Sequence, residues 1–142
     1  MAEVTIGQEA PDFTLRDENG KDVHLADMRG QPTVLMFYPL DFSPTCTNEM
    51  CEIRDRSSEI DPTGARVFGI SRDSSYTHKA FKEKEGLKIS LLADMKGDVA
   101  RSYGAWNEAI GIAERLTVVI DKDGKVAFTD RSASIPDRKS VV

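Results

Sequence analysis

This chain of 142 residues has little cysteine, histidine or tryptophan: it contains two cysteines, two histidines and one tryptophan. It lacks any apolar run near the 18 or so residues that would indicate a membrane-spanning helix. It also lacks a basic stripe, and its net charge of −5 argues against a general nucleic-acid-binding protein. The opening MAEVTIGQEA has no basic region followed by an apolar segment, so we expect no secretory signal and a cytoplasmic location.

The scarcity of cysteine and histidine limits metal chemistry. A structural zinc site needs four ligands, but Cys46, Cys51, His24 and His78 fall in separate elements without ligand spacing. His24 alternates with apolar residues of an expected strand and so points outward, and His78 falls on the polar face of an expected helix. We therefore expect both histidines at the surface, and neither a metal nor another cofactor.

Apolar runs and turn residues predict a single domain over residues 1–142, built on a mixed α/β sheet with helices on both faces. Continuous apolar runs such as TVLMFY are typical of strands that are covered on both faces. The expected elements are an N-terminal β-hairpin that turns at 19–20, strands at 33–38 and 66–70, a helix through Tyr76, Ala80 and Phe81 that stops at Gly86, an extended piece at 89–94, a short helix at 99–103, and a closing hairpin that turns at 121–124.

Both cysteines lie in the stretch YPLDFSPTCTNEMC, residues 38–51. Ser43 is a favoured residue for a helix N-cap, and Pro44 is favoured at the first helical position. This places Cys46 in the first turn of a helix, where backbone N–H groups lack partners and the helix dipole favours an anion. The sequence therefore predicts that Cys46 can form a thiolate.

The two cysteines are expected on different sides of this helix. Cys46 shares a stripe with Met50, Ile53 and Ile60, which we expect to face the core, whereas Cys51 projects about 140° away, toward solvent. Their Cα atoms would be about 8–9 Å apart on an intact helix, but a disulfide needs less than about 7 Å. A structural disulfide therefore conflicts with the helix. An ordinary core cysteine remains possible for Cys46, and a redox pair that works by local unfolding fits best.

Three residues of this stretch resemble the peroxiredoxin signature, in which a proline, three residues, a threonine or serine and two residues precede the reactive cysteine. Here the three are Pro39, Ser43 and Cys46. A second cysteine five residues on, Cys51, resembles the Q-type (bacterioferritin-comigratory-like) peroxiredoxins. The flanking stretches GQEAPDFTLRDENGKDV, CTNEMCEIRD and YGAWNEAIGIAERLTVVIDKDGKV are similar to the family's opening hairpin, first active-site helix and last hairpin. The resemblance implies a thioredoxin-like fold.

The resemblance also implies roles for individual residues. Cys46 would be the peroxidatic cysteine, which a peroxide oxidises to sulfenic acid, and Cys51 the resolving cysteine that forms a disulfide with it. Arg115 matches the family's active-site arginine. Pro39 would shield the thiolate. Ser43, a serine where threonine is more usual, would hydrogen-bond the peroxide or the thiolate.

Nearby acids make a fixed cation necessary. Asp41, Glu49 and Glu52 would oppose the ionisation of Cys46, so a positive group must outweigh them. Arg115 is the expected group by the resemblance; without the resemblance, it would be read as half of a surface ion pair. Glu49 matches an acidic residue that the family carries three positions after its cysteine, where it would orient the arginine; otherwise it is a solvated helix side chain. The alternative cations are Arg54 and Arg101.

Two further segments have no clear element pattern. Trp106 lies in the loop-like YGAWNE, where we expect it to serve packing. Chains of the family usually continue into a C-terminal helix, whereas this sequence ends in SASIPDRKSVV. If the helix is missing and not dispensable, bare apolar sheet surface would favour self-association, and we expect a monomer or a weak homodimer.

By this resemblance the expected function is a thiol peroxidase that reduces hydrogen peroxide or organic hydroperoxides. Its reductant would be a thioredoxin-like protein, and we expect neither a nucleic-acid nor a membrane partner. One alternative is a general thiol–disulfide oxidoreductase, although the usual motif of that class separates its cysteines by two residues. The other alternative is a redox-sensing module without catalytic turnover.

Overall fold

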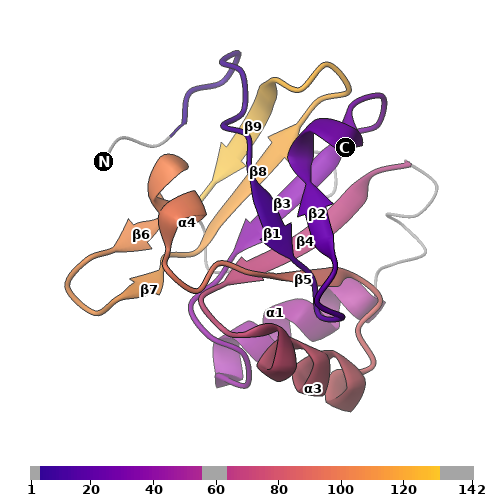
Figure 1. The fold of residues 1–142 in the computed structure, drawn as a ribbon, viewed down its shortest axis with the longest axis vertical. Helices are drawn as coiled ribbons and strands as arrows, with labels where there is room; N and C mark the ends of the chain where they lie inside the picture. The colour runs from indigo at the N-terminus through magenta and orange to yellow at the C-terminus, as the bar shows by residue number, and fades with distance from the viewer. Residues whose placement is uncertain (1–3, 56–63, 132–142) are drawn as a thin grey trace.

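A seven-stranded mixed sheet with helices on both faces forms the body of residues 4–55 and 64–131, the parts of the chain that the computed structural model describes (Figure 1). The strand order is β2-β1-β5-β4-β3-β8-β9. The neighbouring strands β3, β4 and β5 run parallel, and the other neighbouring pairs are antiparallel. The predicted sheet is therefore confirmed, whereas a single domain over all of residues 1–142 stays a prediction.

The elements follow the predicted chain order, with three additions. The short helix η1 and the two-residue strands β6 and β7, which pair with each other, were not predicted. Elements this short cannot display an apolar period. No helix within the described ranges is long and apolar enough to cross a membrane. The elements are β1 (Thr14–Arg16), β2 (Asp22–His24), η1 (Leu25–Met28), β3 (Thr33–Phe37), α1 (Pro44–Asp55), β4 (Arg66–Ser71), α3 (Ser75–Glu85), β5 (Ser90–Ala93), α4 (Asp98–Ser102), β6 (Trp106–Asn107), β7 (Ile112–Ala113), β8 (Leu116–Ile120) and β9 (Val126–Asp130).

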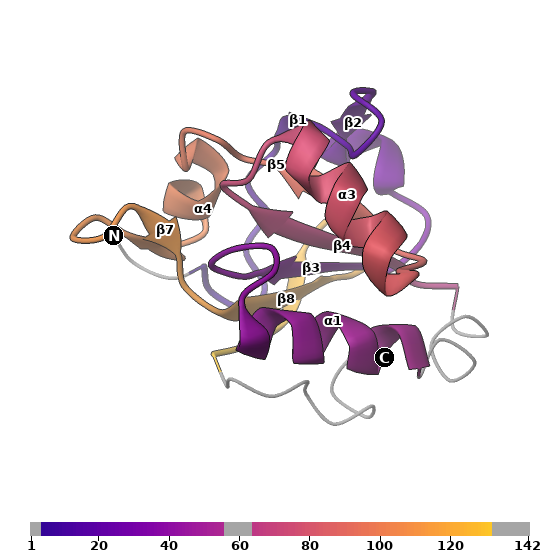
Figure 2. The same ribbon diagram turned by 90° about the horizontal axis from the view of Figure 1, so that it is seen from below.

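The two faces of the sheet carry separate apolar cores. Every residue of β3 is buried, and alternate side chains point to opposite faces. Met36 packs with Met50 of α1 and Phe81 of α3, and Figure 2 shows these two helices side by side on one face. Phe37 packs with Val99 of α4 on the other face. The chain between β3 and α1 therefore leaves the sheet on the side that α3 covers.

Residues at its two ends fix the boundaries of α3. Ser74 is the N-cap, because its hydroxyl oxygen accepts the N–H of Thr77 at 3.2 Å. Gly86 ends the helix with a left-handed φ of 64°, and its N–H donates to the carbonyl of Lys82. The predicted stop at Gly86 is thus confirmed. These ends matter below because α3 contacts both the loop before Cys46 and Cys51.

Candidate active site

The loop between β3 and α1 begins at the carboxyl end of β3. Pro39 is half-buried there, whereas Leu40 and Phe42 are exposed. Phe42 has a left-handed φ of 67°, a conformation that costs free energy in a bulky residue. Its ring meets the ring of Phe81 edge-on, with 5.0 Å between centroids. A contact with α3 thus helps to hold this strained turn just before the cysteine helix.

The helix that follows begins where the sequence predicts. The N–H of Thr47 donates to the carbonyl of Ser43 at 2.8 Å, which makes Ser43 the residue that precedes the helix, and α1 starts at Pro44. Cys46 is therefore the third residue of α1. At this place the partial positive charge of the helix N-terminus favours a thiolate. The structure describes the backbone but not the side chain of Cys46.

The hydroxyl of Ser43 is engaged within the loop. It donates to the carbonyl of Leu40 at 3.1 Å. A serine hydroxyl has one proton, so in this rotamer its oxygen can only accept a further hydrogen bond. Donation to a peroxide or to a thiolate would need the hydroxyl to rotate, and the role expected for Ser43 stays a prediction.

Cys51 lies on the same helix. Its side chain is half-buried, and its Sγ lies 3.3 Å from Oε1 of Glu85, the last residue of α3. The expected solvent-facing position is therefore wrong, because α3 covers the flank of α1 that a projection of one isolated helix assigns to water. Since α1 is continuous from Pro44 to Asp55, a disulfide between Cys46 and Cys51 requires part of it to unwind.

Arg115 lies at the same edge of the sheet as the loop. It directly precedes β8, whose first residue, Leu116, pairs with Phe37 at the end of β3. The side chain is half-buried and its Nη1 is fully buried. The backbone of Arg115 thus lies beside the carboxyl end of β3, where the loop to the cysteine helix begins.

Of the other expected charged residues, Arg101 is placed elsewhere. It lies on α4, where it donates to Glu108 at 2.8 Å and stacks 5.0 Å from the ring centroid of Trp106. That ion pair lowers the pKa of Glu108, mainly through the hydrogen bond from Arg101. Trp106 packs against the core and Arg101 of α4, which agrees with the packing role expected for it. The side chains of Glu49 and Arg54 lie outside the described parts of the structure.

Asp41 and His78 meet in the core, where no sequence pattern placed them. Both side chains are fully buried, with His78 Nδ1 2.6 Å from Asp41 Oδ2. The hydroxyl of the buried Tyr38 donates to the other oxygen of Asp41 at 2.5 Å. Burial raises the pKa of Tyr38 well above its ordinary value, and the charge of Asp41 raises it further. Asp41 is therefore a partner of Tyr38 and His78, and not the bare local acid that the sequence suggested.

The expectation that His78 lies at the surface is wrong, whereas His24 is exposed as predicted. The apolar pattern through Tyr76, Ala80 and Phe81 predicted the wrong buried face for α3, because Tyr76 is 90% exposed. The buried residues of this helix are His78 and Phe81. Their spacing of three places them on one face, so a search for partners of Phe81 could have found His78.

The polar cluster around Asp41 brings three groups together that can each bind a metal ion. One ligand atom from each of Asp41, Asp73 and His78 lies within 4.8 Å of the other two. However, an ion that held Nδ1 of His78 and Oδ2 of Asp41 in tetrahedral geometry would separate them by about 3.4 Å. Their observed distance of 2.6 Å fits a shared proton instead.

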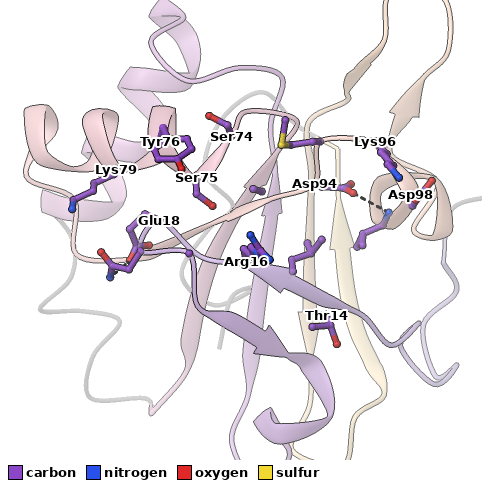
Figure 3. A pocket seen from close by; sticks show the side chains of 16 residues that line it. Thr14, Arg16, Glu18, Ser74, Ser75, Tyr76, Lys79, Asp94, Lys96 and Asp98 are labelled. Atoms are coloured by element: carbon purple, nitrogen blue, oxygen red, sulfur yellow. Dashed lines mark hydrogen bonds between the residues drawn. The ribbon is translucent and has the colours of Figure 1, made fainter.

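A separate groove opens on another part of the molecule, between β1, the end of β5 and the N-termini of α3 and α4 (Figure 3). Its volume is about 760 Å³. Asp94 lies in it and accepts the N–H groups of Val99 and Ala100, and burial raises the pKa of this aspartate. The lining mixes both signs of charge and includes neither Pro39, Ser43, Cys51 nor Arg115.

The chain belongs to the AhpC/TSA family, which matches residues 6–129. Named relatives agree with the Q-type resemblance. The chain is 42% identical over 139 residues to chloroplastic peroxiredoxin Q of Arabidopsis thaliana, covering 97% of this chain but 64% of that protein. It thus spans less than two thirds of the plant protein. Against peroxiredoxin Bcp of Bacillus subtilis the identity is 38% over 141 residues, covering 94% of this chain and 89% of the relative.

Solved structures show the same fold. The crystal structure of peroxidoxin BcpB from Mycobacterium tuberculosis is similar with a TM-score of 0.84 and 34% identity, over 89% of this chain and 85% of that one. The thioredoxin-like fold expected from the sequence is therefore confirmed. These relatives share a family and an architecture with this chain, and the roles of its individual residues remain proposals.

Proposed function

We propose that this chain is a thiol peroxidase that reduces hydrogen peroxide or organic hydroperoxides through Cys46 and Cys51. The observation that carries the proposal is the placement of both cysteines on the continuous helix α1, with Cys46 in its first turn. Membership of the AhpC/TSA family and the peroxiredoxin names of the relatives support it.

The proposed reaction takes place in two steps. The Cys46 thiolate attacks one peroxide oxygen, the O–O bond breaks, and the products are Cys46 sulfenic acid and, after protonation, water or an alcohol. The Cys51 sulfur then attacks the sulfenic sulfur, and water leaves as the disulfide forms. In sum, two thiols are oxidised to a disulfide while one peroxide is reduced.

Neighbouring residues would assist the first step. Arg115 would stabilise the thiolate and the negative charge that develops on the leaving oxygen, because a guanidinium offers several donors at fixed angles. Pro39 would shield the sulfur from water, and Ser43 would contact the peroxide or the thiolate. Glu49 would orient the arginine.

A thioredoxin-like protein would reduce the disulfide and complete the cycle. This requires a reducing compartment, which the cytoplasm provides. The exposed side chains of Leu40 and Phe42 beside the helix offer apolar contact area to an organic peroxide or to the reductant. We propose that the protein acts as a monomer or a weak homodimer, with no nucleic-acid or membrane partner.

Turnover separates the three candidate functions. With catalytic protein and excess dithiothreitol, a peroxidase consumes many equivalents of hydrogen peroxide. A redox sensor would be oxidised stoichiometrically and then stop, so it adds no sustained peroxide consumption over the dithiothreitol blank. A general oxidoreductase would instead accelerate the reduction of a protein disulfide such as insulin. We expect the wild type to consume peroxide and Cys46→Ser not to do so. We expect the wild type not to accelerate insulin reduction above the dithiothreitol blank.

A further inference from the structure

A buried polar network fastens the loop before Cys46 to α3. Asp41 lies in this loop, and its carboxylate is held by Tyr38 at the end of β3 and by His78 of α3. The other ring nitrogen of His78, Nε2, lies 3.0 Å from the carbonyl oxygen of Leu92 in β5. The network therefore links the loop to two strands and one helix at the carboxyl ends of the parallel strands.

The contacts fix the number of protons in this network. The carbonyl of Leu92 can only accept, so Nε2 of His78 carries a hydrogen. The hydroxyl of Tyr38 donates to Asp41 Oδ1, and one further proton lies between His78 Nδ1 and Asp41 Oδ2. Asp41 and His78 together are therefore neutral, and both oxygens and both nitrogens are satisfied. The raised pKa of Tyr38 is consistent with a phenol that keeps its proton.

The backbone of the same residue is held as well. The N–H of Asp41 donates to Oδ2 of Asp73 at 2.8 Å, and the hydroxyl of Ser71 donates to the same oxygen. The next residue, Phe42, has the strained left-handed backbone and rests on Phe81. Neighbouring elements thus hold the side chain and the backbone of Asp41 as well as the ring of Phe42. These two residues lie immediately before the start of α1.

Stability alone explains such a network poorly. Ion pairs without solvent contact are often no more stabilising than apolar side chains of similar volume. The surroundings here are apolar, since Tyr38 packs with Phe81 and Leu91 in the core beneath α1 and α3. A chain that needed only a filled core could use three apolar residues. Unlike apolar side chains, polar groups whose hydrogen bonds are all satisfied define one position for the loop.

We propose that His78 is a positioning residue for peroxide reduction: through Asp41 it holds the loop that carries Pro39 and Ser43 in register with the start of α1. This inference rests on the proposed function, and it adds a residue from α3 that does not touch the peroxide. Misplacement of a reacting geometry by about 1 Å can cost about a hundredfold in rate. Loss of the contact should therefore slow the peroxide reaction far more than a general reaction of the same thiol.

The test compares two reactions of Cys46 in full-length protein that carries Cys51→Ser, so that Cys46 is the one thiol. One rate is sulfenate formation with hydrogen peroxide, and the other is alkylation by iodoacetamide, which needs a thiolate but no peroxide-binding geometry. His78→Leu should lower the ratio of peroxide rate to alkylation rate about tenfold or more. His24→Leu, at the exposed histidine, is the matched control and should leave the ratio unchanged.

Two further variants keep the test decisive. Asp41→Asn can accept from Tyr38 and donate to a neutral His78, so it should retain most of the ratio if position, and not charge, is what matters. Tyr38→Phe loses one hydrogen bond to Asp41 but keeps the ring, and should lower the ratio severalfold even if His78→Leu does not fold. A wild-type ratio in every folded network variant, with only the melting temperature lowered, would overturn the proposal.

Failure of the proposed function has a different outcome. If the Cys51→Ser protein forms no sulfenate with hydrogen peroxide or with an organic hydroperoxide although Cys46 is alkylated, the peroxidase itself is excluded. If that protein forms sulfenate and the network variants match it in ratio, the peroxidase stands and the positioning role of His78 does not.

Discussion

At the scale of single residues, we propose that Arg115, which directly precedes β8, sets how reactive Cys46 can be. Glu49 and Glu52 lie near Cys46 along α1, and like charges disfavour a thiolate. Asp41, which also seemed to act against ionisation, is balanced by His78 in the core. The demand on a positive group is therefore smaller than the sequence suggested, but it does not vanish.

We expect Arg115→Ala to slow the reaction of Cys46 with hydrogen peroxide by about a hundredfold, the size of the loss when one preorganised donor is removed from a reacting oxygen. Stopped-flow kinetics with excess hydrogen peroxide measures the rate of Cys46 oxidation. Arg101→Ala is the control, because Arg101 is held by Glu108 on α4 and should leave the rate unchanged. A slow Arg101→Ala beside a normal Arg115→Ala would show that the cation was misassigned.

At the scale of elements, the two cysteines sit on a helix that must open for them to meet. Local opening needs far less free energy than global unfolding. In α1, Thr45, Thr47 and Asn48 are indifferent helix formers, and Met50 and Ile53 supply its buried face. Upstream, the fixed Asp41 and Phe42 give the opening a boundary, so the unwinding should begin after the loop and leave it in place.

Amide hydrogen exchange tests this opening. In the disulfide-oxidised protein, exchange should be faster across α1, residues 44–55, than in the reduced protein, while β3, β4 and β8 keep their protection. Reduction should restore the slow exchange. Equal exchange of α1 in both states would mean that Cys51 does not resolve Cys46 by unwinding this helix.

The contact between Cys51 and Glu85 should oppose the opening. The thiol has to leave Oε1 of Glu85 before it can reach Cys46, and such a hydrogen bond contributes roughly 1 kcal/mol. Glu85→Ala should therefore form the disulfide roughly fivefold faster after sulfenate formation. It should also be less prone to oxidation of Cys46 to the sulfinic acid, because a second peroxide has less time to react.

Glu83→Ala is the matched control for that experiment, since Glu83 is an exposed glutamate on the same helix. Rapid quenching with an alkylating agent, followed by mass spectrometry, measures the appearance of the disulfide in both variants. The same rate in Glu85→Ala and Glu83→Ala would show that the contact with α3 does not restrain Cys51.

At the scale of the whole molecule, the sequence predicted what periodicity and turn chemistry encode. The apolar run of β3, the start of α1 at Pro44 and the stop of α3 at Gly86 each depend on near neighbours, and each was found where expected. The partners of His78 could not be read in this way, because they are Asp41, thirty-seven positions away, and a carbonyl of β5.

The same limit explains the error at Cys51. A helix projection places Cys46 and Cys51 on different sides of one helix. It does not tell which neighbouring element covers each side of that helix. Only the packing of α3 beside α1 brings Glu85 to the sulfur. Long-range neighbours of polar residues were therefore beyond the sequence, whereas the positions of both cysteines on one helix were not.

Buried tyrosines should make the folded protein sensitive to alkaline pH. The pKa values of Tyr38 and Tyr103 are raised, in both cases mainly by burial. An unfolded tyrosine ionises near pH 10, so above about that pH the unfolded state releases protons that the folded state keeps, and the free energy of unfolding falls. Tyr38→Phe should lose less stability between pH 8 and pH 11 than the wild type in urea titrations. An equal loss would mean that Tyr38 ionises within the folded protein.

The most direct test of the proposed peroxidase is the intact mass of the protein after one equivalent of hydrogen peroxide. The wild type should lose about 2 Da, because Cys46 and Cys51 form a disulfide, and the Cys51→Ser variant should gain about 16 Da as a sulfenic acid. Cys46→Ser should keep its mass. A gain of 16 Da in Cys46→Ser, or an unchanged wild type whose thiols are both reduced at the start, would contradict the assignment of Cys46 as the residue that reacts with peroxide.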